Sequence, residues 1–396
     1  MALSRQFCRH LSTLCAGVIT LTAALVPSAH AAVSVSDEGN HGPAKPNLAA
    51  AAFTQMRNPS VMPEGVNTGC VPEDGRNPVV LIHGMGSNPY GSFSALGPAL
   101  AADGRCVYAP TFGKYEGSRP LISNVEGVYG LKPASESLAE ISADIDAIKA
   151  HTGAAQVDIV GYSLGGALAA MYAKQVGAEG VGTVVTIGGV IHGTNLLGLS
   201  HFVHEAEEAG LPMYEASDRL LGGAAKDLLE GSHAMDTLGD GGVEAEGVNY
   251  ISISSTSDIT VTPLQNSQFH GPGSTAIVVQ DGCSKDRSSH IGLPYSPRAI
   301  SLTRRALGAD VEPVCGSGAP SSSERSKDEN TEATPNNAAA EDDTAESSTA
   351  DDAAEEGSAG SNGEPADDTN ADSSSDSPAT TEAEGKDTHA AFEHAA

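Results

Sequence analysis

The sequence predicts an α/β protein built on a doubly wound, mostly parallel sheet with helices on both faces. Three observations lead to this fold class. Short apolar, β-branched runs recur along the chain, helical patterns lie between most of them, and the runs are mostly continuous instead of alternating with polar residues. Continuous apolar strands are typical of a parallel sheet, because helices cover both of its faces.

Six runs are the predicted strands. In chain order they cover residues 78–82, 106–109, 157–160, 181–187, 250–253 and 276–279. The predicted helices between and after them cover residues 93–102, 135–151, 164–176 and 297–307. The second helix places Leu138, Ile141, Ile145 and Ile148 on one stripe, which is the spacing of a helix that packs against a core.

Two segments depart from this alternation. Residues 194–242 contain helix-like pieces at 201–209 and 214–230 but no predicted strand. They form either a cap over the carboxyl edge of the sheet or a plain connecting helix pair, and the pattern leaves both open. Residues 33–70 are rich in Ala, Pro and Asn and have little periodicity. We expect them to wrap the surface and to be held there by Cys70.

The two ends of the chain differ from its middle. A basic start, an apolar run over 11–26 and the small residues Ala29 and Ala31 predict a cleaved secretory signal peptide over 1–31. The run is short for a membrane anchor, which needs about 20 residues. Residues 316–396 hold 21 acidic and 3 basic side chains, a net charge of −18 out of −30 for the chain. They are expected to be a disordered acidic tail, because so polar a segment buries too little apolar surface to fold.

The remaining residues, 32–315, are enough for one α/β catalytic domain. The acidic balance argues against a nucleic-acid partner, which demands basic patches. No segment after the signal peptide is apolar enough to cross a bilayer, so we expect a secreted, extracellular protein and not an integral membrane protein. The sequence does not determine the oligomeric state, and a monomer is expected.

Four cysteines remain once the signal peptide, with Cys8 and Cys15, is removed. An even number in an exported protein indicates two disulfides, whereas a zinc site would require closer spacing of the cysteine pairs. We expect Cys70 to pair with Cys106 and Cys283 with Cys315, one of three possible connectivities. The first bond would hold the N-terminal arm on the sheet.

Ser163 is the candidate nucleophile. It lies in Gly161-Tyr162-Ser163-Leu164-Gly165, which fits the pattern G-x-S-x-G, after an apolar strand and before a helix. The pattern alone is weak, and small residues would suit any tight strand-to-helix turn. In this context, however, the glycines permit strained backbone angles at the serine, and the helix directs its N-terminal amides at the site.

A serine hydroxyl needs a base, and the base needs an acid to orient it. Asp258 follows the predicted strand at 250–253, and His290 lies in the loop after the next strand. Both come after the serine in the order that such a triad requires. Seven rivals fit less well, because they precede the acid in the chain, precede a strand or serve a loop: Asp240, Asp281, His192, His201, His204, His233 and His270.

The developing negative charge on a substrate oxygen needs two backbone donors. The strand at 78–82 runs into His83-Gly84, and the amide of the next residue, Met85, can face that oxygen. The amide of Leu164, next to the nucleophile, is the second candidate donor. His83 itself is expected to be structural, bonding within its own loop.

The chain resembles the secreted actinobacterial triacylglycerol lipases of the class 2 lipase group, which have the α/β-hydrolase fold. The resemblance runs from about residue 63 to residue 315 and is carried by PEGVNTGCVPEDGRNPVVLIHGMGSN, LAADGRCVYAPTFG, TGAAQVDIVGYSLGG, GGVIHGTN, SDITVTP and VVQDGCSKDRSSHIGLP. It implies a triad of Ser163, Asp258 and His290 and oxyanion donors on Met85 and Leu164.

The resemblance also implies an activity, the hydrolysis of carboxylic esters of lipids such as triacylglycerols, at an oil–water or envelope interface and without a metal or cofactor. Two alternatives remain. The same mechanism would serve a phospholipid, an envelope mycolate ester or a polyester. A surface binding protein on an inactive hydrolase scaffold would be expected to lack a triad member, and none is missing.

Overall fold

Six parallel strands form the central sheet of the computed structural model, in the order β4-β3-β5-β6-β7-β8. The structure describes residues 39–73, 75–117 and 120–316. Within them the strands are β3 (Val79–Ile82), β4 (Val107–Tyr108), β5 (Val157–Tyr162), β6 (Val181–Ile187), β7 (Asn249–Ser254) and β8 (Thr275–Val278). The predicted parallel sheet is confirmed.

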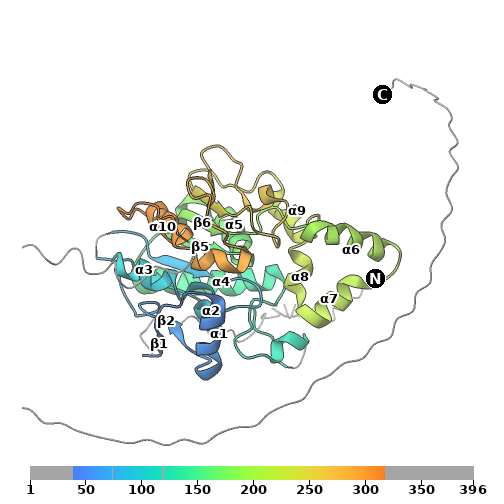
Figure 1. Cartoon of the computed structure of the whole chain (residues 1–396), viewed down its shortest axis with the longest axis horizontal. Coiled ribbons are helices and arrows are strands. Elements are labelled where there is room, and N and C mark those ends of the chain that lie inside the picture. Colours follow the sequence, from blue (N-terminus) through green and yellow to red (C-terminus); the bar gives the residue numbers. More distant parts are fainter. Residues whose placement is uncertain (1–38, 74, 118–119, 317–396) are drawn as a thin grey trace, which may run out of the picture. The chain divides into compact units, whose positions relative to one another are not determined.

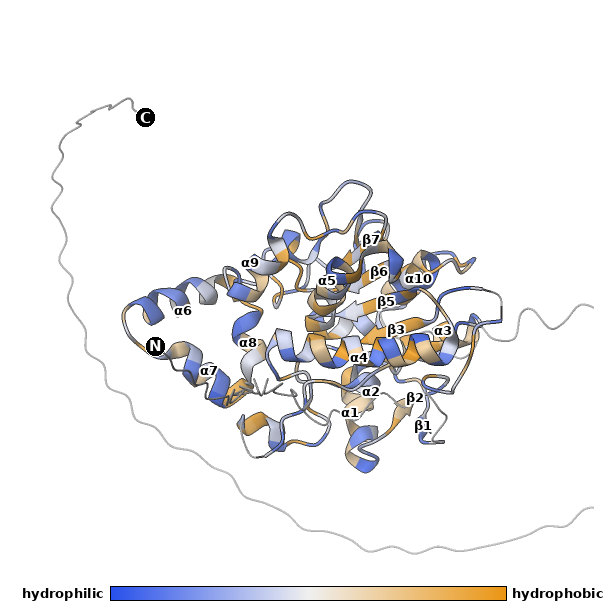
Figure 2. Cartoon of the chain, turned by 180° about the vertical axis from the view of Figure 1, so that it is seen from behind, coloured by the Kyte–Doolittle hydropathy of each residue, from blue (hydrophilic) through white to orange (hydrophobic). Residues whose placement is uncertain are grey.

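Helices cover both faces of this sheet (Figure 1). Side chains of β3 show the two faces: Val80 and Ile82 enter one core, whereas Val79 and Leu81 enter the other. The first core contains residues of α4 (Ala134–Thr152) and α5 (Leu164–Val176). The second contains residues of α1 (Leu48–Arg57), α2 (Pro89–Phe93), α3 (Leu96–Ala102) and α10 (Pro297–Ala306). Helices therefore cover both faces, which explains why most residues of the central strands are apolar (Figure 2).

The N-terminal segment contains a helix that the sequence pattern did not predict. Asn47 begins α1 as its N-cap, where its side chain accepts a hydrogen bond from the amide of Ala50 at 2.9 Å. The helix buries Ala51 and Gln55. Its surroundings include a two-stranded parallel sheet, β1 (His41–Gly42) and β2 (Met62–Pro63). Alanine favours helix strongly but gives no apolar stripe, so periodicity missed this element.

The insertion after β6 is helical, as expected, but its second helix is divided. The structure has α6 (Leu199–Glu208), α7 (Met213–Leu221), α8 (Gly223–Asp227) and α9 (His233–Gly239). Gly222 separates α7 from α8 with φ +90°, and a Cβ there would lie 2.4 Å from the carbonyl oxygen of Leu131. Helices α8 and α9 contribute to the first core, whereas α6 and α7 form a pair beside it (Figure 1). Whether the insertion caps the carboxyl edge of the sheet or only connects its strands stays open, as in the prediction.

Both expected disulfides are present. Cys70 bonds to Cys106 and Cys283 to Cys315, each pair with 5.3 Å between its Cα atoms. These bonds account for every cysteine in the described ranges, so no cysteine there is a free thiol. The predicted signal peptide and, beyond Gly316, the predicted acidic tail lie outside the described residues. In the part of the chain that the structure describes, no helix has the length and apolar character to cross a membrane.

Candidate active site

Ser163 lies at the turn between β5 and α5 in a strained backbone conformation, with φ 55° and ψ −120°. The turn requires its small neighbours, because a Cβ on Gly161 would lie 2.3 Å from the carbonyl oxygen of Gly165. A Cβ on Gly165 would lie 1.9 Å from the carbonyl oxygen of Ile82. The glycines thus have a packing role, whereas the strained residue between them carries a hydroxyl, and strain of this kind clusters at functional sites.

The structure brings Ser163, His290 and Asp258 together at the carboxyl edge of the sheet. The hydroxyl oxygen of Ser163 lies 2.9 Å from Nε2 of His290, and Nδ1 of His290 lies 2.7 Å from Oδ2 of Asp258. All three side chains are buried. Asp258 stands in the turn after β7, and His290 begins the short 3-10 helix η5 (His290–Tyr295) after β8.

Backbone amides hold the carboxylate of Asp258. Its Oδ1 accepts hydrogen bonds from Thr260 at 2.7 Å and from Val261 at 3.0 Å, which leaves Oδ2 for His290. A carboxylate only accepts, so Nδ1 of His290 must carry the proton. Nε2 is then an acceptor directed at the hydroxyl of Ser163, and this is the tautomer that a general base requires.

Two residues to which the sequence analysis assigned no role lie beside His290. The hydroxyl of Tyr162 donates to the backbone carbonyl of His290 at 3.2 Å, and the two rings lie 5.3 Å apart. Gly188, directly after β6, has φ +54°, and a Cβ there would lie 3.3 Å from Nδ1 of His290 and 3.4 Å from Oδ2 of Asp258. The sequence signal that could have identified Gly188 is its position directly after an apolar strand, at the edge of the sheet where the site lies.

The candidate oxyanion donors flank the nucleophile. Leu164 is the first residue of α5, where helix amides have no partner within the helix. Met85 follows Gly84, whose backbone faces the elbow, since a Cβ on Gly84 would lie 3.2 Å from Cβ of Ser163. Glycine at this position therefore lets the loop after β3 approach the serine.

His83 is structural, as expected. It is fully buried, stacks on Phe112 with 4.1 Å between ring centroids, and donates from Nδ1 to the carbonyl of Gly84 at 2.9 Å. Burial lowers its pKa from 6.5 to about 4, against the smaller opposite effect of the Gly84 carbonyl. The ring therefore remains neutral at neutral pH and braces the loop that holds Met85.

Several rival histidines are engaged elsewhere. His192 stacks on His270 with 5.2 Å between ring centroids. The Nε2 of His192 donates to the carbonyl of Gln268, and the Nε2 of His270 donates to the carbonyl of Gln265, each at 3.1 Å. His204 is bonded to the hydroxyl of Tyr214 and to the carbonyl of Glu230. Among the rivals for the base, these three thus have other partners.

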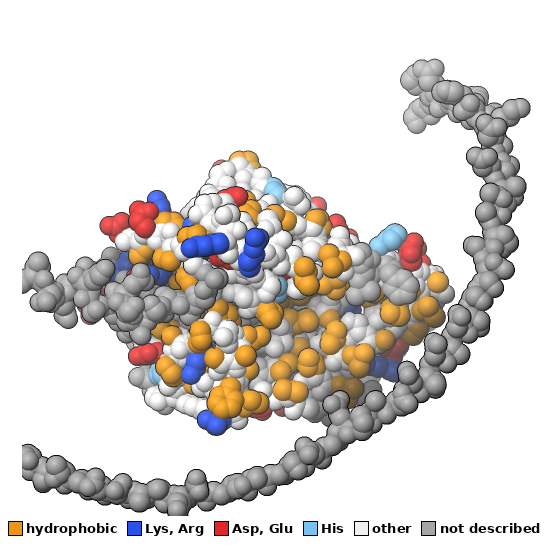
Figure 3. Space-filling model, viewed as in Figure 1, with side chains coloured by type: hydrophobic (Ala, Val, Ile, Leu, Met, Phe, Trp, Pro, Cys, Tyr) orange, Lys and Arg blue, Asp and Glu red, His pale blue; other side chains and the backbone are white. Residues whose placement is uncertain are grey.

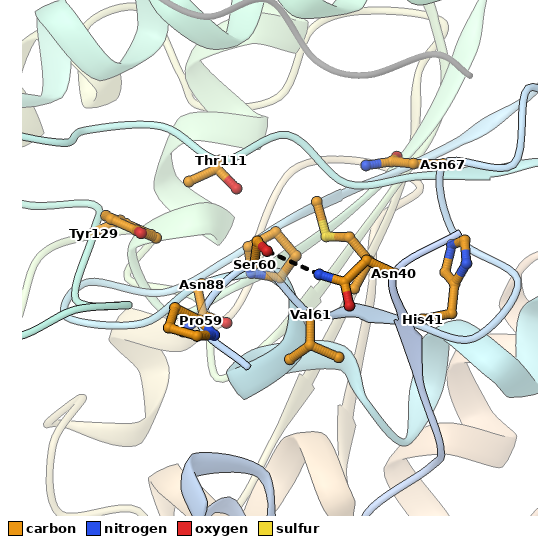
Figure 4. Close-up of a pocket in the computed structure, with 11 residues that line it drawn as sticks. Asn40, His41, Pro59, Ser60, Val61, Asn67, Asn88, Thr111 and Tyr129 are labelled. Atoms are coloured by element: carbon orange, nitrogen blue, oxygen red, sulfur yellow. Dashed lines mark hydrogen bonds between the residues drawn. The ribbon is translucent and has the colours of Figure 1, made fainter. Parts of the chain in front are cut away.

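Two hollows in the described part of the chain lie apart from the three residues. The one in Figure 4, of about 210 Å³, is lined by both polar and apolar side chains, and among them Asn40 donates to the hydroxyl of Ser60 at 2.8 Å. Asn67 and Asn88, also at its wall, are bonded to backbone groups. The other, of about 590 Å³, lies between α4, α5, α8 and α9. Neither is lined by Ser163, Asp258 or His290.

The sheet order, the strained serine between β5 and α5, and the acid and histidine after β7 and β8 define the α/β-hydrolase fold. A family model described as the alpha/beta hydrolase fold matches residues 77–217, which include β3, the elbow and α5. The match ends before Asp258 and His290, so the assignment of these two residues depends on the geometry.

The chain is also similar to solved hydrolase structures at low identity. Lipase B of Aspergillus fumigatus is 18% identical with a TM-score of 0.47, over 62% of this chain and 56% of that one. The chain thus spans little more than half of that lipase. The mature lipase BlEst2 of Bacillus licheniformis is 15% identical with a TM-score of 0.40, over 60% of this chain and 94% of that one. An esterase of Exiguobacterium antarcticum is 13% identical with a TM-score of 0.40, over 59% and 92%. No curated protein matches the sequence.

Proposed function

We propose that this protein is a secreted serine hydrolase that cleaves carboxylic esters of lipids through an acyl-enzyme on Ser163. The observation that carries the proposal is the buried chain of two hydrogen bonds from Ser163 through His290 to Asp258. Each member sits on a different loop at the same edge of the sheet. A core needs no such arrangement, whereas acyl transfer does.

In the proposed reaction His290 takes the Ser163 proton at Nε2 while the serine oxygen attacks the ester carbonyl. The proton then passes to the leaving alcohol, and the acyl group remains on Ser163. A water that His290 deprotonates hydrolyses this acyl-enzyme and restores the serine. Asp258, fixed by the amides of Thr260 and Val261, keeps the imidazole in the required tautomer and stabilises its positive charge.

The negative charge that develops on the carbonyl oxygen requires donors. We assign this role to the backbone amides of Met85 and Leu164, and the positive end of α5 adds to it. Loss of one donor from such a site typically costs a factor of about 100 to 1,000 in kcat.

Apolar side chains beside the triad support a lipid substrate. Ile291 follows His290 and is 57% exposed, and Ile259 follows Asp258 and is 67% exposed. Leu197 is 72% exposed, and its amide bonds to the hydroxyl of Thr262 in the same turn region as Asp258. Figure 3 shows further apolar side chains gathered over the part of the molecule where α1 and α7 lie. Exposed apolar surface of this kind marks sites that bind apolar partners.

Secretion is supported by the two disulfides, since such bonds persist mainly in oxidising compartments. The signal peptide predicted over residues 1–31 agrees with it.

The function is tested by measuring hydrolysis of p-nitrophenyl esters with short and long acyl chains, and of emulsified triglyceride, by wild type and by Ser163→Ala. We expect activity only in the wild type, with higher kcat/KM on longer chains. A phospholipid, a mycolate ester and a polyester in the same panel distinguish the alternative substrates. A wild-type protein that hydrolyses none of these esters would contradict the proposal.

A further inference from the structure

Two loops that are far apart in sequence must hold Asp258 and His290 in line with Ser163. The acid lies in the turn that follows β7, and the histidine lies at the end of the loop that follows β8. The hydrogen bond from Nδ1 of His290 to Asp258 joins only the two side chains. The backbones of the two loops are held together by a separate set of hydrogen bonds.

Ser255 is the residue that joins them. Its side chain is fully buried, and its hydroxyl donates to the carbonyl of Ser288 at 2.6 Å, two residues before His290. The same oxygen accepts from the amide of Ser257 at 3.1 Å, in the turn that carries Asp258, and from Nε2 of Gln280 at 2.9 Å. A hydroxyl has one proton and two lone pairs, so this one is fully used.

Gln280 supports the same junction from the end of β8. Its Oε1 accepts from the amide of Thr256 at 3.0 Å, on the acid side. Its Nε2 donates to Ser255 and also to the carbonyl of Asp286 at 3.2 Å, on the histidine side. The amide group therefore spans the gap between the loops in parallel with the hydroxyl of Ser255.

Asp286 completes the network on the histidine side. It is fully buried, its Oδ1 accepts from the amide of Ser288 at 2.8 Å, and its Oδ2 accepts from the hydroxyl of Ser296 at 2.8 Å. Ser296 is the N-cap of α10. The carbonyl that Ser255 contacts thus belongs to a residue whose amide is anchored to α10 through a buried carboxylate.

We propose that Ser255 is a positioning residue for the hydrolysis, holding the loops of Asp258 and His290 in register with Gln280 and Asp286 as its supports. This inference rests on the proposed function. It predicts a loss in kcat with little change in KM, because the network touches no substrate and affects only the alignment of the base. A misplacement of about 1 Å in a catalytic group can cost about 100-fold, so we expect a loss of at least tenfold.

The test compares Ser255→Ala with Ser137→Ala. Ser137 is also fully buried, but its hydroxyl donates to the carbonyl of Lys132 at the start of α4. Both variants lose one buried hydroxyl, so a general loss of stability affects both. Rates are measured well below each Tm on a soluble ester, and the resonance of the His290 Nδ1 proton is followed by NMR. We expect a loss of kcat and of this resonance only in Ser255→Ala.

Two further variants keep the test decisive. Ser255→Thr retains the hydroxyl and should recover much of kcat, and Gln280→Ala removes the second link at a half-buried position if Ser255→Ala does not fold. The inference is overturned if folded Ser255→Ala keeps its kcat within about twofold of wild type, or if only its KM changes. If Ser255→Ala does not fold, the same criteria apply to Gln280→Ala. The NMR comparison does not need turnover, so it still tests the positioning if the wild type proves inactive on esters.

Discussion

The hydroxyl oxygen of Ser163 lies 2.9 Å from Nε2 of His290, although 127 residues separate them in the chain. The pairing depends on backbone as much as on side chains. The amide of Ser163 bonds to the carbonyl of Ile187 at the end of β6, and its carbonyl accepts from the amide of Val190. These two bonds therefore fix the turn at Ser163 to the end of β6 and the loop that follows it.

Replacement of Ser163 should separate activity from stability. Ser163→Ala and Ser163→Gly both remove the nucleophile, and kcat should fall by several powers of ten in each. Glycine relaxes at φ 55° whereas alanine does not, so we expect the glycine variant to be more stable by about 1 kcal/mol. Ester hydrolysis and urea unfolding measure the two effects. More than about a tenth of wild-type activity in either variant would refute the nucleophile assignment.

Gly188 should be required for the alignment of the triad. In Gly188→Ala the added methyl group would meet Leu293 at 3.2 Å, His290 at 3.3 Å and Asp258 at 3.4 Å, so the imidazole must shift. We expect kcat to fall at least tenfold. The free energy of unfolding should also fall by about 1 kcal/mol, because alanine is strained at φ +54°.

Gly153→Ala is the matched control for that variant. Gly153 ends α4 with φ +70°, but a Cβ there meets no atom within 4 Å. It should lose a similar amount of stability and keep its kcat. If the two alanine variants had the same kcat, Gly188 would have only a conformational role.

The strands and the elbow were predictable because both leave a strong local signal. Continuous apolar runs mark buried parallel strands, and two glycines around a serine mark the turn. The loop network was not predictable in the same way. Ser255, Gln280 and Asp286 act through single hydrogen bonds between segments that meet only in the folded state. Polar side chains in loops follow no sequence periodicity from which such partners could be predicted.

Helix boundaries show the same limit. The expected piece at 214–230 is divided at Gly222, because the chain passes the carbonyl of Leu131 there. That contact joins residues about 90 positions apart, so no local pattern contains it. The helix α1 was missed for the opposite reason, since its Asn47 cap and its alanines are local signals that a search for apolar stripes passes over.

The two disulfides should differ in their effect on activity. Cys283 lies in the turn between Gln280 and Asp286, with its amide bonded to the carbonyl of Gln280 and its carbonyl accepting from Asp286. The bond to Cys315 thus fixes the loop that carries His290. Replacing both cysteines by Ser should lower kcat as well as Tm, and the chain-entropy model gives about 3–4 kcal/mol for the lost constraint.

The Cys70–Cys106 bond provides the comparison. It closes a loop of similar length, with a sequence separation of 36 against 32, but joins the N-terminal arm to the start of β4. The double Ser variant should lose a comparable amount of stability and keep its kcat at temperatures where it is folded. Equal losses of kcat in the two double variants would show that the Cys283 loop has no special role.

His83 should make the protein less stable in mild acid. Its pKa is about 4 in the folded state against 6.5 in the unfolded chain, because burial disfavours the charged ring. Between these two values the unfolded state binds more protons, so stability falls as the pH is lowered from 6.5 to 4. Above pH 6.5 the ring is neutral in both states and contributes no pH dependence, and below pH 4 the loss levels off. A pKa difference of about 2.5 lowers the free energy of unfolding by roughly 3 kcal/mol once the pH has fallen to 4.

His83→Asn isolates this contribution, since asparagine keeps a donor for the carbonyl of Gly84 but does not titrate. Urea unfolding of both proteins at pH 7, 5.5 and 4 gives the stability of wild type minus that of the variant. We expect this difference to fall by roughly 3 kcal/mol from pH 7 to pH 4. His201→Asn is the control, because His201 is largely exposed. The stability of wild type minus that of His201→Asn should change by less than about 0.5 kcal/mol between pH 7 and pH 4. A His83→Asn difference that stays constant over this range would show that the ring is protonated as easily in the folded protein as in water.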